Sequence, residues 1–175
     1  MFLDESGFLL VPNVTRTWAP RGQTPLLRCA GHWDKISAIS ALSVSPKRRR
    51  VALYARFHPK QNIRSPEVAR FLGQLLRHLR GHVVLLWDGG RPHQGAVVKA
   101  FLRTHPRLRT SPFPGYAPEL NPDEFVWNHL KRAMANSVPT DLRHLKQLIH
   151  CPLQRLRQSQ RLLWSCLHAS KLPWP

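Results

Sequence analysis

The sequence predicts one α/β domain followed by a helical C-terminal appendage, and three observations predict this fold class. The chain has 175 residues, enough for one ordinary domain, and 42% of them are hydrophobic, enough to build a core. Apolar runs typical of strands come first, and segments of helical periodicity then alternate with further strands. The longest apolar runs fall far short of the ~20 residues that a bilayer span needs, so we expect no membrane partner.

The first third of the chain is predicted to form strands. Residues 2–11 read as a short strand, a break at Ser6-Gly7 and a second apolar run. Residues 33–44 and 51–57 form two β-like runs, and the basic, proline-bearing connection between them suits a hairpin.

Helices and strands alternate in the middle of the chain. Apolar residues recur at helical spacing over 66–80, which predicts an amphipathic helix. The near-continuous apolar run 82–88 is typical of a strand buried on both faces. A helix is expected over about 93–104, and residues 108–113 read as a short edge strand.

The last part of the chain is predicted to be helical. One helix starts at Asn121 and runs to about residue 136, and a final helical region, broken near Pro152, occupies roughly 140–168. We expect residues 1–138 to form the main domain and residues 139–175 to form a helical extension packed on it.

The charge of the chain points to a polyanionic partner. Lysine and arginine total 27 against 9 aspartates and glutamates, which makes a formal charge of +18 and a pI of about 11.6. A balance of this kind indicates nucleic acid as the partner.

Cysteine usage and the N-terminal residues predict a reducing, cytoplasmic environment. Cys29, Cys151 and Cys166 show no C-x-x-C spacing, and their odd number provides no disulfide framework. Asp4 and Glu5 stand where the apolar region of a signal peptide would lie, so we expect no export signal.

The nine carboxylates are informative because they are rare in this chain. Five of them lie in two short windows, namely Asp4, Glu5, Glu119, Asp123 and Glu124. Asp88 ends the most apolar predicted strand, at the edge where sites of open α/β sheets usually lie. Spacing alone equally allows Asp88 to be a cap of a helix or turn, formed with the two following glycines, rather than a site residue. Asp4 has a similar setting and also admits an interpretation as a turn residue.

Glu124 begins a predicted helix. Asn121-Pro122-Asp123-Glu124 fits a capping box, with Asn at the N-cap, Pro at N1 and Glu at N3. Periodicity alone favours the capping interpretation, although a carboxylate held in a first turn can also bind a metal. Acids from separate elements that meet would repel one another unless a divalent cation lies between them. Carboxylate oxygens suit Mg²⁺ or Mn²⁺, and two such ions can clamp the attacking and leaving oxygens of a phosphoryl displacement.

Four motifs, in order along the chain, carry a resemblance to a known family. They are Leu3-Asp4-Glu5-Ser6-Gly7-Phe8, Trp18-Ala19-Pro20-Arg21-Gly22, Asp88 through His93, and Tyr116 through Trp127. Together they resemble the catalytic domain of the mariner-like transposases, in particular their bacterial insertion-sequence relatives. The resemblance covers the chain up to about residue 136, and the last motif is its most specific part.

The resemblance implies a fold and a catalytic site. The fold is ribonuclease H-like, a mixed five-stranded sheet flanked by helices, which agrees with the predicted order of elements. Asp4, Asp88 and Glu124 would form the catalytic triad of two aspartates and a glutamate (DDE) that binds two Mg²⁺ or Mn²⁺ ions. Between Asp88 and Glu124 there are 35 residues, a separation in keeping with that group. Glu119 and Asp123 would lie at the surface or behind the metal-binding carboxylates.

His93 matches a histidine that commonly follows the second aspartate in this family. Two interpretations of His93 are equal. It either supports the metal-binding carboxylates from behind, or it stands at a helix start and takes no part in the chemistry. The chain departs from the family at Gly89-Gly90, because an asparagine often follows that aspartate. Relatives also carry a helix-turn-helix region ahead of the first aspartate. We therefore expect recognition of element ends to reside elsewhere, such as in a separate N-terminal helix-turn-helix polypeptide.

Basic residues supply candidate contacts to the DNA backbone. The run Lys47-Arg48-Arg49-Arg50 lies at a predicted hairpin tip, where a solvated loop is an equal interpretation. The other candidates are Arg21, Lys131 and Arg132. Such contacts give affinity without sequence discrimination. The tryptophans that we expect in the core are Trp18, Trp33, Trp87, Trp127 and Trp164.

The leading hypothesis is a DDE transposase catalytic domain, an endonuclease and strand transferase that cleaves and joins DNA phosphodiester bonds. Water, and later a DNA 3′-hydroxyl, would attack the phosphodiester without a covalent enzyme intermediate. The expected partners are element ends and target DNA, bound by a homodimer in the bacterial cytoplasm in association with the nucleoid. One alternative is a non-catalytic, basic DNA-binding remnant of a truncated transposase. Another is a structure-selective nuclease of the same fold.

Overall fold

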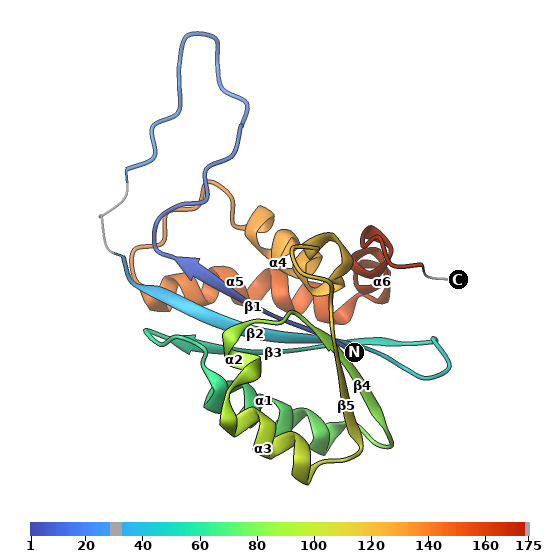
Figure 1. Ribbon diagram of the computed structural model, residues 1–175. Helices are drawn as coiled ribbons and strands as arrows, with labels where there is room; N and C mark the ends of the chain where they lie inside the picture. The colour runs from blue at the N-terminus through green and yellow to red at the C-terminus, as the bar shows by residue number, and fades with distance from the viewer. Residues whose placement is uncertain (29–32, 174–175) are drawn as a thin grey trace.

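The computed structural model describes residues 1–28 and 33–173, and this part of the chain contains a mixed five-stranded sheet (Figure 1). The strands are β1 (Phe2–Leu9), β2 (Lys35–Val44), β3 (Val51–Pro59), β4 (Val83–Trp87) and β5 (Leu108–Pro112). They lie in the order β3-β2-β1-β4-β5, with β1 antiparallel to β2 and β2 antiparallel to β3. β4 is parallel to β1, and β5 is parallel to β4. The sheet predicted from the sequence is confirmed, and β5 is the expected edge strand.

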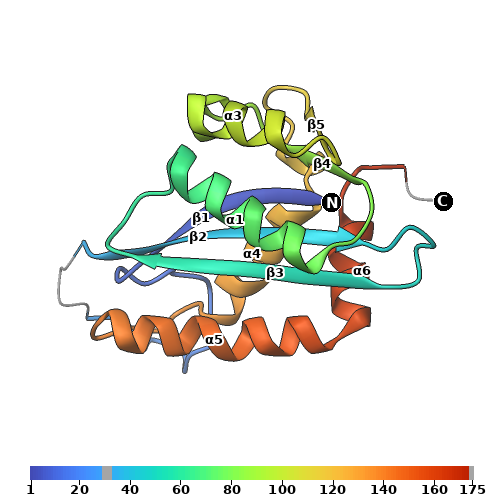
Figure 2. The same cartoon turned by 90° about the horizontal axis from the view of Figure 1, so that it is seen from below.

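Helices cover both faces of this sheet (Figure 2). The helices of one face are α1 (Ser65–His78), α2 (Arg91–Gln94) and α3 (Ala96–Thr104). Those of the other face are α4 (Pro122–Ala133), α5 (Leu142–Gln158) and α6 (Gln160–Ala169), and the 3-10 helix η1 (Pro118–Leu120) precedes α4. No helix of the described residues combines the length and the hydrophobicity that crossing a bilayer requires.

Alternation along the strands divides the core into two layers. Leu3 of β1 and Ile39 of β2 pack with α1 and α3, whereas Phe2 and Phe8 pack with α4, α5 and α6. Successive side chains of a strand point to opposite faces, so neighbouring residues of β1 serve different layers. Asp4 and Glu5, the two acids of β1, therefore point to opposite faces of the sheet.

β1 runs unbroken from end to end, so the predicted break at Ser6-Gly7 is wrong. Each residue of β1 pairs with β2 in antiparallel register. The hydrogen bonds of that ladder outweigh the low strand propensity of a serine-glycine pair.

The predicted break near Pro152 is also wrong, because α5 continues through this residue and ends at Gln158. A proline in a helix interior costs about 3 kcal/mol. The same helix buries Leu145, Ile149, Leu153 and Leu156, and full burial of such a side chain is worth about 1.5–3 kcal/mol. Packing on the sheet therefore outweighs the lost backbone hydrogen bond.

The helix predicted over 93–104 is divided in two. α2 begins at Arg91, and Gly95 has an extended conformation that separates α2 from α3. The hairpin and the other helices lie where the sequence predicts them, within a few residues at each end.

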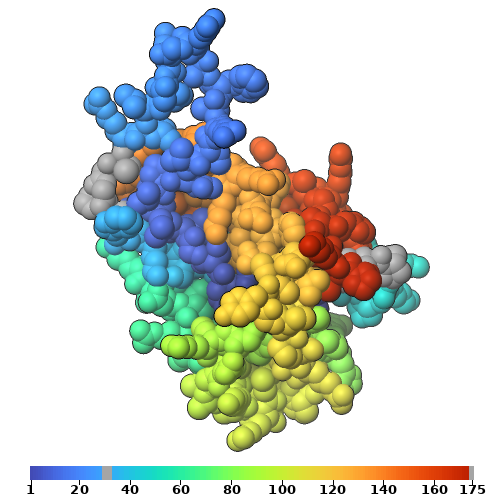
Figure 3. Space-filling view, turned by 45° about the horizontal axis from the view of Figure 1, so that its top comes forward, coloured from blue at the N-terminus to red at the C-terminus, as the bar shows by residue number. Residues whose placement is uncertain are grey.

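Residues 10–28, which follow β1, extend away from the rest of the molecule (Figure 3). Trp18 of this segment is 99% exposed, and Trp33, just before β2, is 79% exposed, so the expected core positions of both are wrong. The segment is rich in proline and glycine, and the described part of it forms neither a helix nor a strand that could bring Trp18 onto the core. Trp87 and Trp127 are buried as expected, and Trp164 packs half-buried against the core. Cys29 lies outside the described residues.

Candidate active site

Three elements position the three predicted metal-binding acids. Asp4 lies on β1, Asp88 follows the last residue of β4, and Glu124 lies in the first turn of α4. Phe2 pairs in parallel with Leu86, so Asp4 and Asp88, two residues further along each strand, emerge at the same level of the sheet. α4 packs against β1 and β2. The structure thus brings acids from distant parts of the chain to the point where β4 ends beside β1.

Asp4 is buried among other acids. Its side chain is on the α4 face of β1, and only 7% of the residue is exposed. Burial, and then the charges of Glu124, Glu5 and Asp88 in that order of effect, together raise the pKa of Asp4 to about 8. Its Oδ2 has no hydrogen-bond partner among the described residues. Asp4 therefore lies within electrostatic reach of both other members of the predicted triad.

Asp123 is a second buried acid, so of its two expected positions, at the surface or behind the predicted ligands, burial excludes the surface. Ser40 Oγ donates a hydrogen bond of 2.7 Å to its Oδ2, whereas Oδ1 has no partner among the described residues. Burial, and then the charge of Asp4, raises the pKa of Asp123 well above its ordinary value. Helical spacing could have revealed it, because Asp123 is in phase with buried Val126, Trp127 and Leu130.

The N-terminus of α4 is fixed to the sheet by Asn121. Its Oδ1 accepts a hydrogen bond of 3.1 Å from the Asp123 N–H, which confirms the predicted N-cap. Its Nδ2 donates one of 3.3 Å to the carbonyl oxygen of Leu3, next to Asp4. The described contacts of this cap do not use the Glu124 carboxylate, so the capping-box interpretation fails for Glu124 and its side chain is available to the site.

His93 lies between two acids. Nδ1 is 2.8 Å from Asp88 Oδ1, and Nε2 is 2.9 Å from Glu5 Oε1. Burial by itself would lower the pKa of His93, but the hydrogen bonds with Asp88 and Glu5 outweigh it and raise the pKa to about 10. The bond with His93 is also the main reason why the pKa of Asp88 is lowered. His93 therefore joins an acid of β1 to the acid that follows β4.

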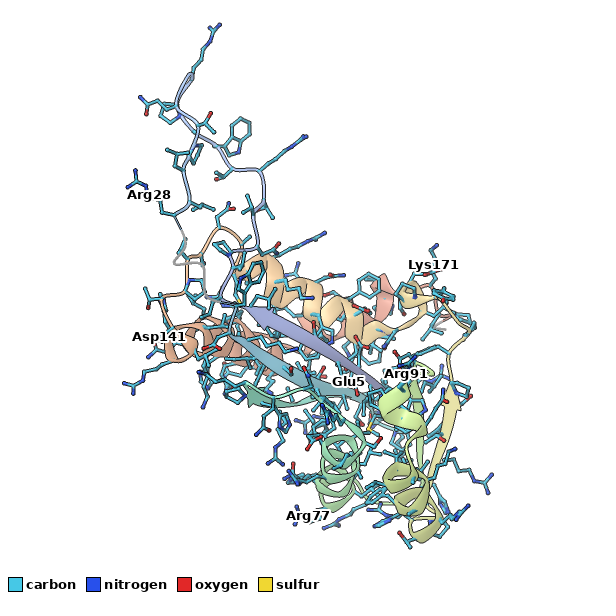
Figure 4. All side chains as sticks on the ribbon, turned by 60° about the vertical axis from the view of Figure 1, so that its left-hand side comes forward. Glu5, Arg28, Arg77, Arg91, Asp141 and Lys171 are labelled. Carbon is cyan, nitrogen blue, oxygen red and sulfur yellow. The ribbon has the colours of Figure 1, made fainter. Side chains whose placement is uncertain are left out.

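Glu5 is the residue of this cluster to which sequence reasoning assigned no role. Alternation along β1 directs Glu5 to the face opposite Asp4, which is where α2 lies. Figure 4 shows Glu5 beside the helix that carries Arg91. The available signal was this alternation, together with the position of His93 in the helix that follows Asp88.

The residues present fit a divalent cation. Asp4, Asp88 and Glu124 offer carboxylate oxygens, the donors that Mg²⁺ and Mn²⁺ prefer. A buried Asp4 oxygen without a partner is a group that a cation would stabilise. Glu5, Asp88 and His93 form a further group whose possible ligand atoms lie within 4.8 Å of one another.

The candidate DNA-binding residues do not gather in one patch. Lys47-Arg48-Arg49-Arg50 are exposed at the β2–β3 hairpin tip, beyond the start of β1. Arg21 is exposed on the long segment that follows the opposite end of β1 (Figure 1). Lys131 and Arg132 lie in the last turn of α4.

Comparison with known proteins adds a family and a fold. The model of a family described as DDE superfamily endonuclease matches residues 1–147. The Mos1 transposase paired-end complex with the left transposon end superposes with a TM-score of 0.71 at 18% identity, over 95% of this chain and 50% of that chain. The Mos1 mariner paired-end complex with Mn also gives a TM-score of 0.71 at 18% identity, over 95% of this chain and 51% of that chain. The catalytic domain of Mos1 mariner transposase gives a TM-score of 0.63 at 15% identity, over 95% of this chain and 74% of that chain.

These similarities confirm the expected ribonuclease H-like fold. The chain spans about half the length of the two longer Mos1 chains. No curated protein sequence matches the chain.

Proposed function

This chain belongs to the DDE superfamily endonucleases, and we propose that it is a transposase catalytic domain that cleaves and joins DNA with two divalent metal ions. One observation carries the proposal. Asp4, a buried carboxylate with an unpartnered oxygen, lies within electrostatic reach of Asp88 and Glu124, which come from two other elements.

Asp4, Asp88 and Glu124 would hold Mg²⁺ or Mn²⁺ through their carboxylate oxygens. When bound, such ions lower the pKa of the attacking water and stabilise the charge on the leaving oxygen. The chain supplies the positions of the ligands. β1 holds Asp4 in the sheet, and Asn121 ties the first turn of α4 to the backbone beside it.

The substrate that the charge favours is DNA. The net charge of +18 suits a phosphate backbone, and the exposed arginines of the hairpin tip can neutralise phosphates. We further propose that the chain acts as a homodimer on element ends and target DNA, together with a separate helix-turn-helix polypeptide.

A cleavage assay with single alanine variants tests this function. The full chain is incubated with labelled duplex DNA and Mg²⁺, with Asp4→Ala, Asp88→Ala and Glu124→Ala beside it. Each variant is expected to lose cleavage while DNA binding, measured in parallel, persists.

Glu119→Ala is the matched control, since Glu119 is an acid near α4 that belongs to no part of the proposed site. It is expected to cleave as the unaltered chain does. Cleavage that survives Asp88→Ala contradicts the proposed site. Binding without any metal-dependent cleavage by the unaltered chain identifies the non-catalytic DNA-binding alternative.

A further inference from the structure

The ring of His93 is held on three sides. It is 5% exposed and stacks on Trp87 with ring centroids 4.3 Å apart and planes 8° from parallel. Nε2 meets Glu5 Oε1, and Nδ1 meets both the Oδ1 and the backbone oxygen of Asp88. Stacking and two hydrogen-bonded nitrogens leave the ring little freedom to rotate.

The contacts of the ring argue against a metal among Glu5, Asp88 and His93. An imidazole binds a metal through the lone pair of a ring nitrogen. Here each nitrogen already lies at hydrogen-bond distance from a carboxylate oxygen, and an N–H that donates has no lone pair to offer. The three residues therefore form a hydrogen-bonded chain, Glu5–His93–Asp88.

The hydrogen bonds that link Glu5, His93 and Asp88 orient the Asp88 carboxylate. The Asp88 side chain is 59% exposed and belongs to the short connection between β4 and α2. Oδ1 accepts hydrogen bonds from His93 Nδ1 and from the Gly90 N–H at 3.0 Å. Within the described chain Oδ2 has no such partner, so fixing Oδ1 determines where Oδ2 points.

We propose that Glu5 and His93 are positioning residues, in which Glu5 fixes the ring and the ring fixes the Asp88 carboxylate for metal binding. The inference rests on the proposed function, because it takes Asp88 to be a metal-binding residue. Glu5 is the neighbour of Asp4 on β1, so one strand anchors both aspartates. Groups that hydrogen-bond to metal ligands commonly tune metal affinity by orienting those ligands.

Two substitutions of His93 separate positioning from packing. The short amide of His93→Asn can place its nitrogen near the Nδ1 position and keep the bond to Asp88. The longer amide of His93→Gln reaches the Nε2 position and keeps the bond to Glu5 instead. Both remove the ring from Trp87, so a purely structural role predicts equal effects.

The measurement is Mn²⁺ binding by the full chain without DNA, by calorimetric titration, with thermal unfolding in parallel. We expect His93→Gln to weaken binding about 10- to 100-fold, and His93→Asn to weaken it clearly less. Glu5→Gln keeps an acceptor oxygen for the ring, so its Mn²⁺ affinity is expected to lie between those of the two His93 variants. His58→Gln is the matched control, because His58 is a buried histidine on β3, and its Mn²⁺ affinity is expected to be unchanged.

Two results would overturn positioning. One is that His93→Asn and His93→Gln lose equal affinity, in step with equal losses of thermal stability. The other is that both retain the affinity of the unaltered chain while Asp88→Ala loses it. If Asp88→Ala itself binds Mn²⁺ normally, the proposed function fails rather than the positioning role alone.

Discussion

Burying a carboxylate oxygen without a hydrogen-bond partner is costly, and Asp4 Oδ2 is such an atom. The Asp4 pKa of about 8 lies far above the ordinary aspartate value of 3.8, because burial and three neighbouring acids disfavour its charge. Between these two pH values the folded chain keeps a proton that the unfolded chain releases. The free energy of unfolding of the metal-free chain should therefore fall as pH rises from about 4 to about 8.

The first prediction concerns how metal binding changes with pH. Mg²⁺ must displace the proton of Asp4, so its affinity should rise between pH 5.5 and pH 8 by at most about tenfold per pH unit. We expect Mg²⁺ to raise the unfolding temperature more at pH 8 than at pH 5.5, measured by differential scanning calorimetry. Asp4→Asn should largely remove this difference. An equal Mg²⁺ effect at both pH values would contradict the role assigned to Asp4.

The second prediction concerns Gly90, which lies against the Asp88 carboxylate. A Cβ at this position would lie 2.9 Å from Asp88 Oδ1, too close unless that side chain moves. The backbone of Gly90 suits alanine, so Gly90→Ala should change the free energy of unfolding by less than about 0.5 kcal/mol. Metal-dependent cleavage should fall about 10-fold or more, because Asp88 is displaced.

Gly89→Ala provides the control for this substitution. Its Cβ would meet only the Gln94 amide nitrogen, at 3.9 Å, so cleavage should be unchanged. Equal cleavage rates for the two alanine variants would show that the position of Asp88 does not limit the reaction.

At the scale of elements, the start of α4 joins the helix to the sheet. Asn121 both caps this helix and bonds to the backbone of β1, and Asp123 bonds to Ser40 of β2. Glu124 occupies the same turn, so its position depends on these contacts.

The third prediction tests that dependence with Asn121→Ala. Loss of an N-cap costs about 0.5–2 kcal/mol, which urea unfolding would measure. Cleavage should fall by about 10- to 100-fold, because Glu124 is no longer held in register with Asp4. Asp141→Ala is the control, since Asp141 caps α5 by accepting a bond from the His144 N–H. It should lose similar stability and keep its cleavage rate; a parallel loss of activity in both variants would refute the positional argument.

Helices and strands were predictable from the sequence where the local pattern of residues agrees with the contacts that the segment makes in the fold. The β2–β3 hairpin follows from two β-like runs joined by a basic, proline-bearing connection, and α1 follows from helical spacing. The positions of Asp4 and Asp88 follow from the strands that contain or precede them. The continuity of β1 and α5 depends on pairing and packing with distant segments, which local propensity does not contain. The Glu5–His93 contact joins residues 88 apart, so it appears only when α2 folds beside β1.

At the scale of the whole molecule, exposed basic residues are spread over several elements, whereas five of the nine acids (Asp4, Glu5, Asp88, Asp123 and Glu124) lie close to one another. The hairpin tip and the long segment after β1 lie at opposite ends of the sheet, so their basic residues cannot act as one patch. The expected result is affinity from several separate phosphate contacts.

The fourth prediction measures the share of the hairpin tip in that affinity. For each of Lys47, Arg48, Arg49 and Arg50 that contacts a phosphate, replacement by glutamine should reduce the salt slope of binding by about 0.9. Fluorescence anisotropy of labelled duplex DNA between 50 and 200 mM salt would measure it. All four residues are exposed, so thermal unfolding should be nearly unchanged. An unchanged slope would exclude the hairpin tip from the DNA interface.

We expect carboxylates from β1, from the end of β4 and from the start of α4 to bind the same divalent ions. An anomalous difference map from crystals of the full chain grown with Mn²⁺ tests it most directly. We expect manganese peaks at coordinating distance from oxygens of Asp4, Asp88 and Glu124, with His93 still between Glu5 and Asp88. Manganese bound at Glu5 and His93 instead, with no peak at Asp4 or Glu124, would contradict it.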